Sequence, residues 1–188
     1  ELCVTGYSCK DLFLQDSLIR AARKALFSLA ERTAGMDVLL VVGAPVERDG
    51  KLYNAAVCIQ DGRILAVAAK TKLPDYGDCV ETRYFVIPQE EDKMIELGDR
   101  EVPFGSGLLL CPDELPEFRV GIEICEELWV PDTPSVRLAL AGATVIVNPS
   151  AGCMLAGRLA ERRDRVKSQS GQLKAAYLYA NAGEGESS

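Results

Sequence analysis

The chain has 188 residues, enough for one medium-sized hydrophobic core and too few for two comfortable domains. With 48% hydrophobic and 26% charged residues it reads as an ordinary globular chain, and no apolar run approaches the roughly 18 residues that a membrane span needs. Its net charge of -7 argues against nucleic acid or an anionic membrane surface as a partner.

The first predicted element is a long amphipathic helix over residues 11–32, where apolar residues recur at helical spacing. Asp11 is its expected N-cap. The run Asp37–Gly43 is apolar and rich in β-branched residues, which favours a strand buried on both faces. Its exit through residues 43–45, Gly-Ala-Pro, is expected to be a turn.

A β-hairpin follows, formed by Leu52–Gln60 and Arg63–Ala69. The dipeptide Asp61-Gly62 between them supplies the positive φ angles of a tight hairpin turn. Residues 71–103, with several prolines and glycines and an acidic run, are expected to be a long irregular segment, and such segments are often functional.

The second half of the chain alternates strands and helices, as α/β folds require. The predicted elements are a strand at Arg119–Cys125, a helix at Ser135–Ala141, a strand at Thr144–Asn148, a helix at Leu159–Lys174 and a strand at Ala176–Ala182. No internal repeat, low-complexity linker or domain boundary is evident.

Cysteine and histidine usage limits the chemistry further. The seven cysteines contain no Cys-x-x-Cys pair, which favours a reducing, cytoplasmic location and at most one functional thiol. The chain has no histidine, which excludes Ser-His-Asp hydrolysis, Cys-His proteases and His-ligated zinc. Acid-base chemistry must then come from carboxylates, amines, thiols or phenols.

Three residues form a chemically complete set without imidazole. Cys125 ends an apolar strand, Lys70 ends another, and Glu1 precedes a short apolar run. A carboxylate can take the proton of a thiol, the thiolate can attack an amide carbon, and an ammonium can stabilise the oxyanion. Taken singly, they could equally be a buried small hydrophobe, an exposed lysine and a charged terminal residue.

The segments around these residues resemble the three catalytic motifs of the nitrilase (carbon-nitrogen hydrolase) superfamily, in order and spacing. They read Glu1-Leu-Cys-Val-Thr-Gly-Tyr7, Lys70-Thr-Lys-Leu-Pro-Asp-Tyr76 and Gly121-Ile-Glu-Ile-Cys125-Glu-Glu-Leu-Trp129. Further segments are similar to the glutaminase domains of glutamine-dependent NAD synthetases, namely Gly6-Tyr-Ser-Cys-Lys-Asp-Leu12, Leu140-Ala-Gly-Ala-Thr-Val145 and Ala182-Gly-Glu-Gly-Glu-Ser187. The resemblance covers nearly the whole chain.

The resemblance implies an α/β fold, the nitrilase-like α-β-β-α sandwich, incomplete at both ends. Residues 1–188 would be a partial glutaminase domain, with the synthetase domain of the same polypeptide absent. No Ser-Gly-Gly-x-Asp-Ser pyrophosphate loop is present in the sequence. The expected activity is hydrolysis of the glutamine amide, which supplies ammonia for ATP-dependent amidation of nicotinic acid adenine dinucleotide.

By the same resemblance, Cys125 would be the nucleophile that forms a thioester, and Glu1 the general base and later acid. Lys70 would hold the oxyanion together with the backbone N–H that follows Cys125, and its charge would favour the thiolate. Glu81 and Glu126 are expected supporting carboxylates, although an exposed loop glutamate is the alternative for Glu81.

Four residues match substrate positions in the family: Tyr7, Tyr76, Gly152 and Arg158. Tyr76 would line the glutamine pocket, Gly152 would allow close approach of backbone, and Arg158 would bind the α-carboxylate. A surface tyrosine, a turn glycine and an arginine on a solvated helix face are the alternatives for the last three.

The expected domain carries no metal and no cofactor, because ATP and Mg would be needed only in the absent synthetase domain. Its expected partners are glutamine, that synthetase domain and further copies in a homo-oligomer. Two other functions stay open: a stand-alone amidase or nitrilase acting on another small amide or nitrile, and a non-catalytic scaffold that has kept the fold.

Overall fold

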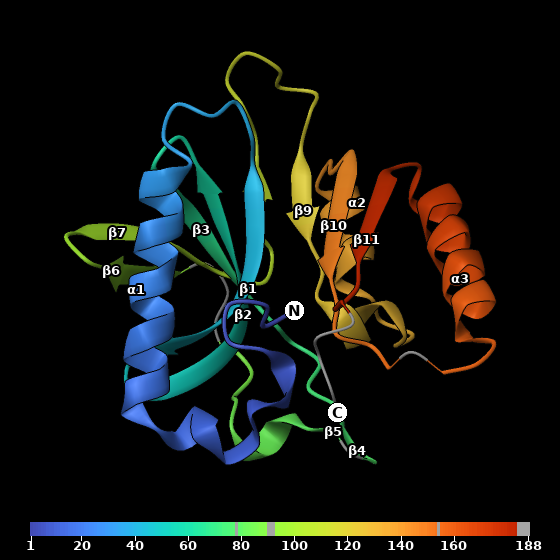
Figure 1. The fold of residues 1–188 in the computed structure, drawn as a ribbon. Coiled ribbons are helices and arrows are strands. Elements are labelled where there is room, and N and C mark those ends of the chain that lie inside the picture. Colours follow the sequence, from blue (N-terminus) through green and yellow to red (C-terminus); the bar gives the residue numbers. More distant parts are fainter. Residues whose placement is uncertain (78, 90–92, 154, 184–188) are drawn as a thin grey trace.

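A computed structural model describes residues 1–77, 79–89, 93–153 and 155–183. Two β-sheets pack face to face, with one long helix outside the first sheet and two helices outside the second (Figure 1). This is the α-β-β-α sandwich predicted from the sequence. It places the carboxyl ends of strands from both sheets near one another.

The described residues contain three α-helices, three 3-10 helices and eleven strands. In chain order these are η1 (Tyr7–Leu14), α1 (Asp16–Arg32), β1 (Leu40–Arg48), β2 (Lys51–Gln60), β3 (Arg63–Ala69), β4 (Asp75–Tyr76), β5 (Cys79–Val80), η2 (Glu81–Arg83), β6 (Lys93–Leu97), β7 (Arg100–Gly105), β8 (Leu109–Leu110), β9 (Val120–Ile122), η3 (Cys125–Leu128), α2 (Pro134–Leu140), β10 (Val145–Pro149), α3 (Arg158–Leu173) and β11 (Ala176–Ala180).

The first sheet has the order β1-β2-β3-β7-β6 and is built mainly from antiparallel pairs, with β3 and β7 parallel. Helix α1 covers its outer face, where Leu26 and Ala30 are buried against the sheet. The opposite, inner face carries small residues such as Ala56, Ala66 and Ala68. Small side chains there let the second sheet approach closely.

The second sheet has the order β11-β10-β9-β8, with β9, β10 and β11 parallel. Val120, Ile122 and Val145 face the first sheet. On the other face, Leu138 of α2 packs over Ile146, and α2 and α3 cover this side. The first of these two apolar clusters holds the sheets together, and the second attaches the outer helices to the second sheet.

Several sequence predictions are confirmed within a residue or two. The hairpin between β2 and β3 turns at Asp61-Gly62, and both residues have positive φ. Helices α2 and α3 and strands β10 and β11 lie where the periodicity places them. Among the described residues, no helix has the length and apolarity to cross a membrane.

The first helix begins later than predicted. Residues 7–14 form the irregular 3-10 segment η1, in which Lys10 has φ 49°, and α1 starts only at Asp16. Asp11 is therefore not an N-cap. Its carboxylate instead accepts hydrogen bonds from the Arg83 guanidinium and the Tyr84 hydroxyl, both at 2.9 Å. This attachment holds η1 against the segment that carries Glu81.

Two predicted irregularities are regular strand in the structure. The turn expected at residues 43–45 is absent, since β1 runs to Arg48 and reverses at Asp49-Gly50. Pro45 is tolerated because β1 is an edge strand, where a missing N–H breaks no ladder. Within 71–103, described residues form the antiparallel pair β6–β7, which the prolines and glycines of the segment concealed.

Candidate active site

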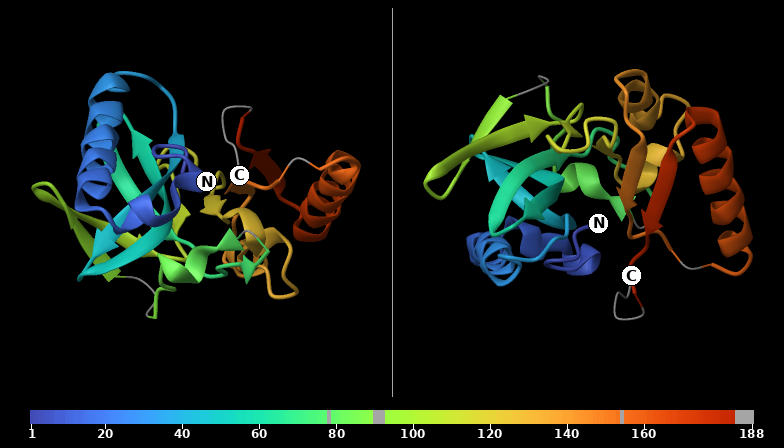
Figure 2. Two further views of the ribbon diagram at one scale, coloured as in Figure 1. Left: turned by 60° about the horizontal axis from the view of Figure 1, so that its bottom comes forward. Right: turned by 90° about the horizontal axis from the view of Figure 1, so that it is seen from above.

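The amino-terminal segment lies in the space between the two sheets (Figure 2). Gly43 of β1 makes this possible, because a Cβ at that position would lie 2.2 Å from the Leu2 backbone nitrogen and 2.7 Å from the Glu1 carbonyl carbon. The Val4 N–H donates to the Gly43 carbonyl at 3.0 Å. A glycine inside a strand often marks such a close approach of backbone. It brings the Glu1 side chain into the interior, where the residue is 6% exposed.

Lys70 follows the last residue of β3 and is buried, with 1% exposure. Its Nζ donates to Glu1 Oε1 at 2.5 Å and to Glu81 Oε1 at 2.7 Å. These three residues form the carboxylate-lysine cluster. A buried ammonium is stable only when it is paired in this way, so the structure excludes the solvent-exposed alternatives for Lys70 and Glu81.

Three further groups surround the carboxylate-lysine cluster. The Asn54 amide donates to Glu1 Oε1 at 2.8 Å and to Glu81 Oε2 at 3.1 Å, and the Tyr7 hydroxyl donates to Glu81 Oε1 at 2.9 Å. The Ala151 N–H donates to Glu1 Oε2 at 3.2 Å. Both carboxylates are therefore held in fixed orientations by donors from separate segments.

Cys125 lies at the start of η3, three residues after the end of β9, and not at the end of the strand itself as predicted. Its φ of 48° is unusual for a residue with a side chain. The Cys125 N–H donates to Asn148 Oδ1 at 2.9 Å, and Asn148 is held in turn by Ser150 and Tyr177. Such strained turns persist where surrounding bonds over-determine them, and they are common at functional sites.

The charges of the carboxylate-lysine cluster shift the pKa of the Cys125 thiol. Burial raises this pKa, the negative charge of Glu1 raises it further, and the positive charge of Lys70 lowers it. Burial alone would raise the pKa of Glu1, but the charge and hydrogen bond of Lys70 outweigh burial and hold it below the ordinary value. At neutral pH the arrangement is therefore a protonated thiol facing an ionised carboxylate.

The second carboxylate behaves differently. Burial and the charge of Glu1 raise the pKa of Glu81 to about 7, against the influence of Lys70. Although burial lowers the pKa of Lys70, the charges of Glu1 and Glu81 more than compensate and raise it above its ordinary value, so the lysine keeps its proton. Lys70 can thus act as a fixed positive charge and hydrogen-bond donor, but not as a base.

The predicted substrate-binding residues lie in more exposed positions. Tyr76 is 63% exposed, and its hydroxyl donates to Glu126 Oε1 at 2.9 Å. The Arg158 guanidinium lies over the Trp129 ring, 5.6 Å from its centroid. We call Tyr76, Glu126, Trp129 and Arg158 the rim. Tyr76 and Arg158 each contact a residue shortly after Cys125, but their side chains do not meet at one shared group, as Glu1 and Glu81 meet at Lys70.

Gly152 lies in the loop after β10, one residue beyond the N–H that binds Glu1. Its N–H and carbonyl form reciprocal bonds of 3.0 Å with the Asn181 side chain. A Cβ here would meet Arg162 Nη2 at 3.3 Å and the Tyr179 hydroxyl at 3.5 Å. The glycine therefore lets this loop pack tightly beside the cluster.

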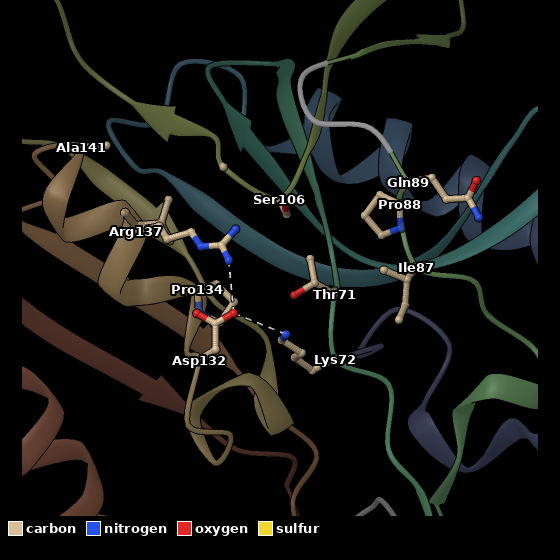
Figure 3. Close-up of a pocket in the computed structure, with 12 residues that line it drawn as sticks. Thr71, Lys72, Ile87, Pro88, Gln89, Ser106, Asp132, Pro134, Arg137 and Ala141 are labelled. Carbon is tan, nitrogen blue, oxygen red and sulfur yellow. Dashed lines mark hydrogen bonds and ion pairs between the residues drawn. The ribbon is translucent and has the colours of Figure 1, made fainter.

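A cavity of about 540 Å³ is lined in part by Thr71, the residue that follows Lys70 (Figure 3). Asp132 also lines this cavity and forms ion pairs with Lys72 at 3.8 Å and with Arg137 at 3.2 Å. A smaller cavity of about 300 Å³ is bordered by Tyr7 and Glu81. Neither is lined by Cys125. Among the described residues, no group of three or more Cys, Asp or Glu side chains could hold a metal ion.

Sequence reasoning missed several residues that build this site, chiefly Asn54, Asn148 and Glu127. Asn54 carried a usable signal, because it is the one amide within the mostly apolar run of residues 52–59. Asn148 stands at the end of β10, where ligands commonly bind in parallel sheets. Glu127 was not selected because it stands next to Glu126, and the sequence alone does not show which of the two glutamates has a buried side chain.

Comparisons with known proteins identify relatives of this chain and of its fold. A profile of the carbon-nitrogen hydrolase family matches residues 1–182. The glutamine-dependent NAD(+) synthetase of Mycobacterium tuberculosis is 43% identical over 187 residues, a match that covers 100% of this chain and 28% of that protein. The solved structure of a glutamine-dependent NAD(+) synthetase from Cytophaga hutchinsonii has a TM-score of 0.83 at 32% identity, covering 96% of this chain and 29% of the other.

A carbon-nitrogen hydrolase from Helicobacter pylori shares the fold, with a TM-score of 0.67 at 19% identity over 95% of this chain and 57% of that chain. The present chain thus spans less than a third of the length of the synthetases that it resembles.

Proposed function

Because the chain belongs to the carbon-nitrogen hydrolase family, we propose that it is the glutaminase part of a glutamine-dependent NAD synthetase and works through Glu1, Lys70 and Cys125. The observation that carries the proposal is the direct contact of a buried lysine with a buried carboxylate beside a half-buried thiol. These groups can hydrolyse an amide without imidazole.

The first half of the reaction begins with the ionised Glu1 carboxylate and the protonated Cys125 thiol. Glu1 takes the thiol proton while Sγ attacks the side-chain amide carbon of glutamine. The oxyanion that forms is stabilised by Lys70 Nζ and by the N–H of Glu126, which belongs to the first turn of η3 and so needs no acceptor within the helix. The C–N bond then breaks, the proton passes from Glu1 to the leaving nitrogen, and ammonia departs from the thioester.

The second half hydrolyses the thioester. Glu1, again ionised, takes a proton from water while the water oxygen attacks the thioester carbon. The same donors stabilise the second oxyanion. The C–S bond breaks, the thiolate recovers the proton from Glu1, and glutamate leaves. The sum of both halves is glutamine plus water giving glutamate plus ammonia.

The rim supports the recognition of glutamine in this proposal. Arg158 would pair with the α-carboxylate, while Tyr76 and Glu126, joined by their hydrogen bond, would face the α-amino group and the chain. The Tyr7 hydroxyl donates to Glu81 Oε1 at 2.9 Å, so in this proposal Tyr7 supports the site through that carboxylate. Gly152 would let the backbone beside Ala151 lie close to the substrate.

The narrower assignment rests on the names of several similar proteins, which are glutamine-dependent NAD(+) synthetases. The ammonia would then be consumed by a synthetase domain on the same polypeptide, which would use ATP and Mg to amidate nicotinic acid adenine dinucleotide. We also propose that the full protein assembles as a homo-oligomer in the cytoplasm.

The test uses the full natural polypeptide that contains this chain, with a Cys125→Ala variant. The wild-type protein should form NAD from nicotinic acid adenine dinucleotide, ATP and either glutamine or ammonium. The variant should lose the glutamine-dependent reaction and keep the ammonium-dependent one. A variant that still uses glutamine would contradict the role of Cys125. Hydrolysis of small amides without NAD formation from either nitrogen source would instead favour a stand-alone amidase.

A further inference from the structure

One buried carboxylate connects the segment that carries Lys70 to the segment that carries Cys125. Glu127, which is 2% exposed, lies two residues after Cys125. Its Oε2 accepts a hydrogen bond of 2.6 Å from the Ile124 N–H. Its Oε1 accepts two bonds of 2.6 Å, from the N–H and the hydroxyl of Thr71. Ile124 precedes Cys125 and Thr71 follows Lys70, so a single side chain holds the backbone beside both residues.

Capping of the short helix η3 explains only part of this arrangement. The bond from Glu127 to the Ile124 N–H is the carboxylate half of a capping box, a local contact within four residues. The two bonds to Thr71 cross from the second sheet to the first and join residues 56 positions apart. A cap alone would not require them.

Other contacts at this end of the sheets constrain the spacing less. The Ala151 N–H bond to Glu1 Oε2 is longer, at 3.2 Å, and the bond from Tyr76 to Glu126 involves a side chain that is 63% exposed. The facing side chains of the two sheets are small or apolar, such as Ala68 and Ile122, and apolar packing is not directional. The neighbouring ion pair between Lys72 and Asp132 is 3.8 Å long, and its side chains are 38% and 63% exposed (Figure 3). Exposed pairs of this kind contribute little. Hydrogen bonds to a buried carboxylate are short, strong and directional.

We propose that Glu127 is a positioning residue that fixes the spacing between the oxyanion-stabilising Lys70 and the nucleophile Cys125. The inference rests on the proposed function only for the roles of those two residues. Coulombic stabilisation of a thiolate or an oxyanion by an ammonium falls with distance, and it depends on geometry held to within about an ångström. Loosening the Glu127 contacts should therefore weaken both effects of Lys70 and leave the rim intact.

The main test is Glu127→Gln in the full natural polypeptide. Glutamine keeps the size of the side chain but turns one accepting oxygen into an NH₂ group that faces N–H donors. We expect kcat for glutamine to fall about 10- to 100-fold per reactive Cys125, with KM changed less than about twofold. Alkylation of Cys125 by iodoacetamide, followed on its own peptide by mass spectrometry, should slow and move to higher pH.

Substitutions of the partner residue provide a graded control. Thr71→Val removes only the hydroxyl bond and should reproduce the same changes more weakly, while Thr71→Ser keeps that bond and should behave like the wild type. The rate of the untreated enzyme is divided by the number of Cys125 thiols that iodoacetamide can alkylate in a parallel sample. This kcat per reactive Cys125 separates a positioning effect from loss of folded protein. If Glu127→Gln fails to fold, the comparison of Thr71→Val with Thr71→Ser decides the question.

The proposal is overturned if Glu127→Gln, or Thr71→Val where the former does not fold, keeps the wild-type kcat per reactive thiol and the wild-type alkylation profile and only lowers Tm. In that case Glu127 is a structural cap. A wild-type protein that does not hydrolyse glutamine, but whose alkylation profile moves in the variants, supports the positioning role and contradicts the proposed function.

Discussion

The carboxylate-lysine cluster and the rim both lie near the turn that carries Cys125, and they are built in opposite ways. Glu1, Lys70 and Glu81 are almost fully buried, and each of them contacts at least two polar partners. In the rim, Tyr76 is 63% exposed and the Arg158 side chain is 46% exposed. Among the described residues, Tyr76 contacts Glu126 and Arg158 contacts Trp129 near the Cys125 turn.

The difference indicates how chemistry and recognition are divided. Groups that must keep shifted pKa values need burial and several fixed donors, so the cluster is assembled before any substrate arrives. Groups that bind a charged, hydrated amino acid can stay solvated until the ligand enters. Substitutions in the cluster should therefore lower kcat, whereas substitutions in the rim should raise KM.

The largest expected effect is that of Lys70→Met. The variant loses the cation that stabilises the oxyanion and the Glu1 carboxylate, so kcat for glutamine should fall about 10²- to 10³-fold. Lys72→Met is the control, because its charge lies two residues away and pairs only with Asp132 at 3.8 Å in the described residues. Steady-state kinetics should show near-normal rates for this control. Equal losses in both variants would mean that the site does not depend on Lys70 specifically.

Gly43→Ala tests whether the strand holds Glu1 in place. The added Cβ would lie 2.2 Å from the Leu2 nitrogen, so the terminal segment must move. Because displacement by about an ångström costs about 10²-fold in rate, kcat should fall by that order. Gly171→Ala, in helix α3 with open space around its Cβ, should keep full activity and gain slightly in stability. A fully active Gly43→Ala protein would show that the approach of Glu1 to β1 is unimportant.

In the rim, Arg158→Ala should raise KM for glutamine about 10- to 100-fold while kcat changes little, since a charged hydrogen bond to the substrate is lost in ground and transition states alike. Arg165→Ala is a close control, because Arg165 also lies over Trp129, at 5.8 Å. Initial-rate measurements over a range of glutamine concentrations separate the two parameters. A fall in kcat at constant KM would place Arg158 with the cluster instead.

The smallest effect concerns Glu81 and pH. Folding raises its pKa from 4.5 to about 7, so its contribution to stability is complete below about pH 4.5 and is lost as the pH rises through about 7. Glu81→Gln removes this dependence. Its Tm relative to wild type should therefore improve by a few degrees between about pH 5 and pH 8. The exposed Glu96→Gln should show a constant difference, and a change of the opposite sign in Glu81→Gln would refute the assignment.

The sequence predicted the parts of the fold that depend on local pattern. The hairpin at Asp61-Gly62 and helices α2 and α3 follow from turn chemistry and periodicity. The start of α1 was wrong because Asp11 binds Arg83 and Tyr84, a contact between distant segments that no local pattern encodes. The hairpin β6–β7 was missed because its turn residues resemble those of a loop.

The same division holds in the site. Glu1, Lys70, Glu81 and Cys125 could be selected from motifs, and the structure brings them together. Asn54, Asn148 and Glu127 were not selected, because their roles depend on partners in distant segments, namely Glu1, Cys125 and Thr71. The left-handed backbone of Cys125 is likewise accompanied by a bond to the distant residue Asn148. The apolar pattern before Cys125 predicts only a strand.

The most direct test of Cys125 as the nucleophile is covalent labelling with a glutamine analogue that carries a diazoketone. In the full natural polypeptide we expect one label, on Cys125, although the chain contains seven cysteines. Labelling should be slowed strongly by Lys70→Met and only slightly by Lys72→Met. A label on any other cysteine, or a rate on Cys125 that is indifferent to Lys70, would contradict the proposed mechanism.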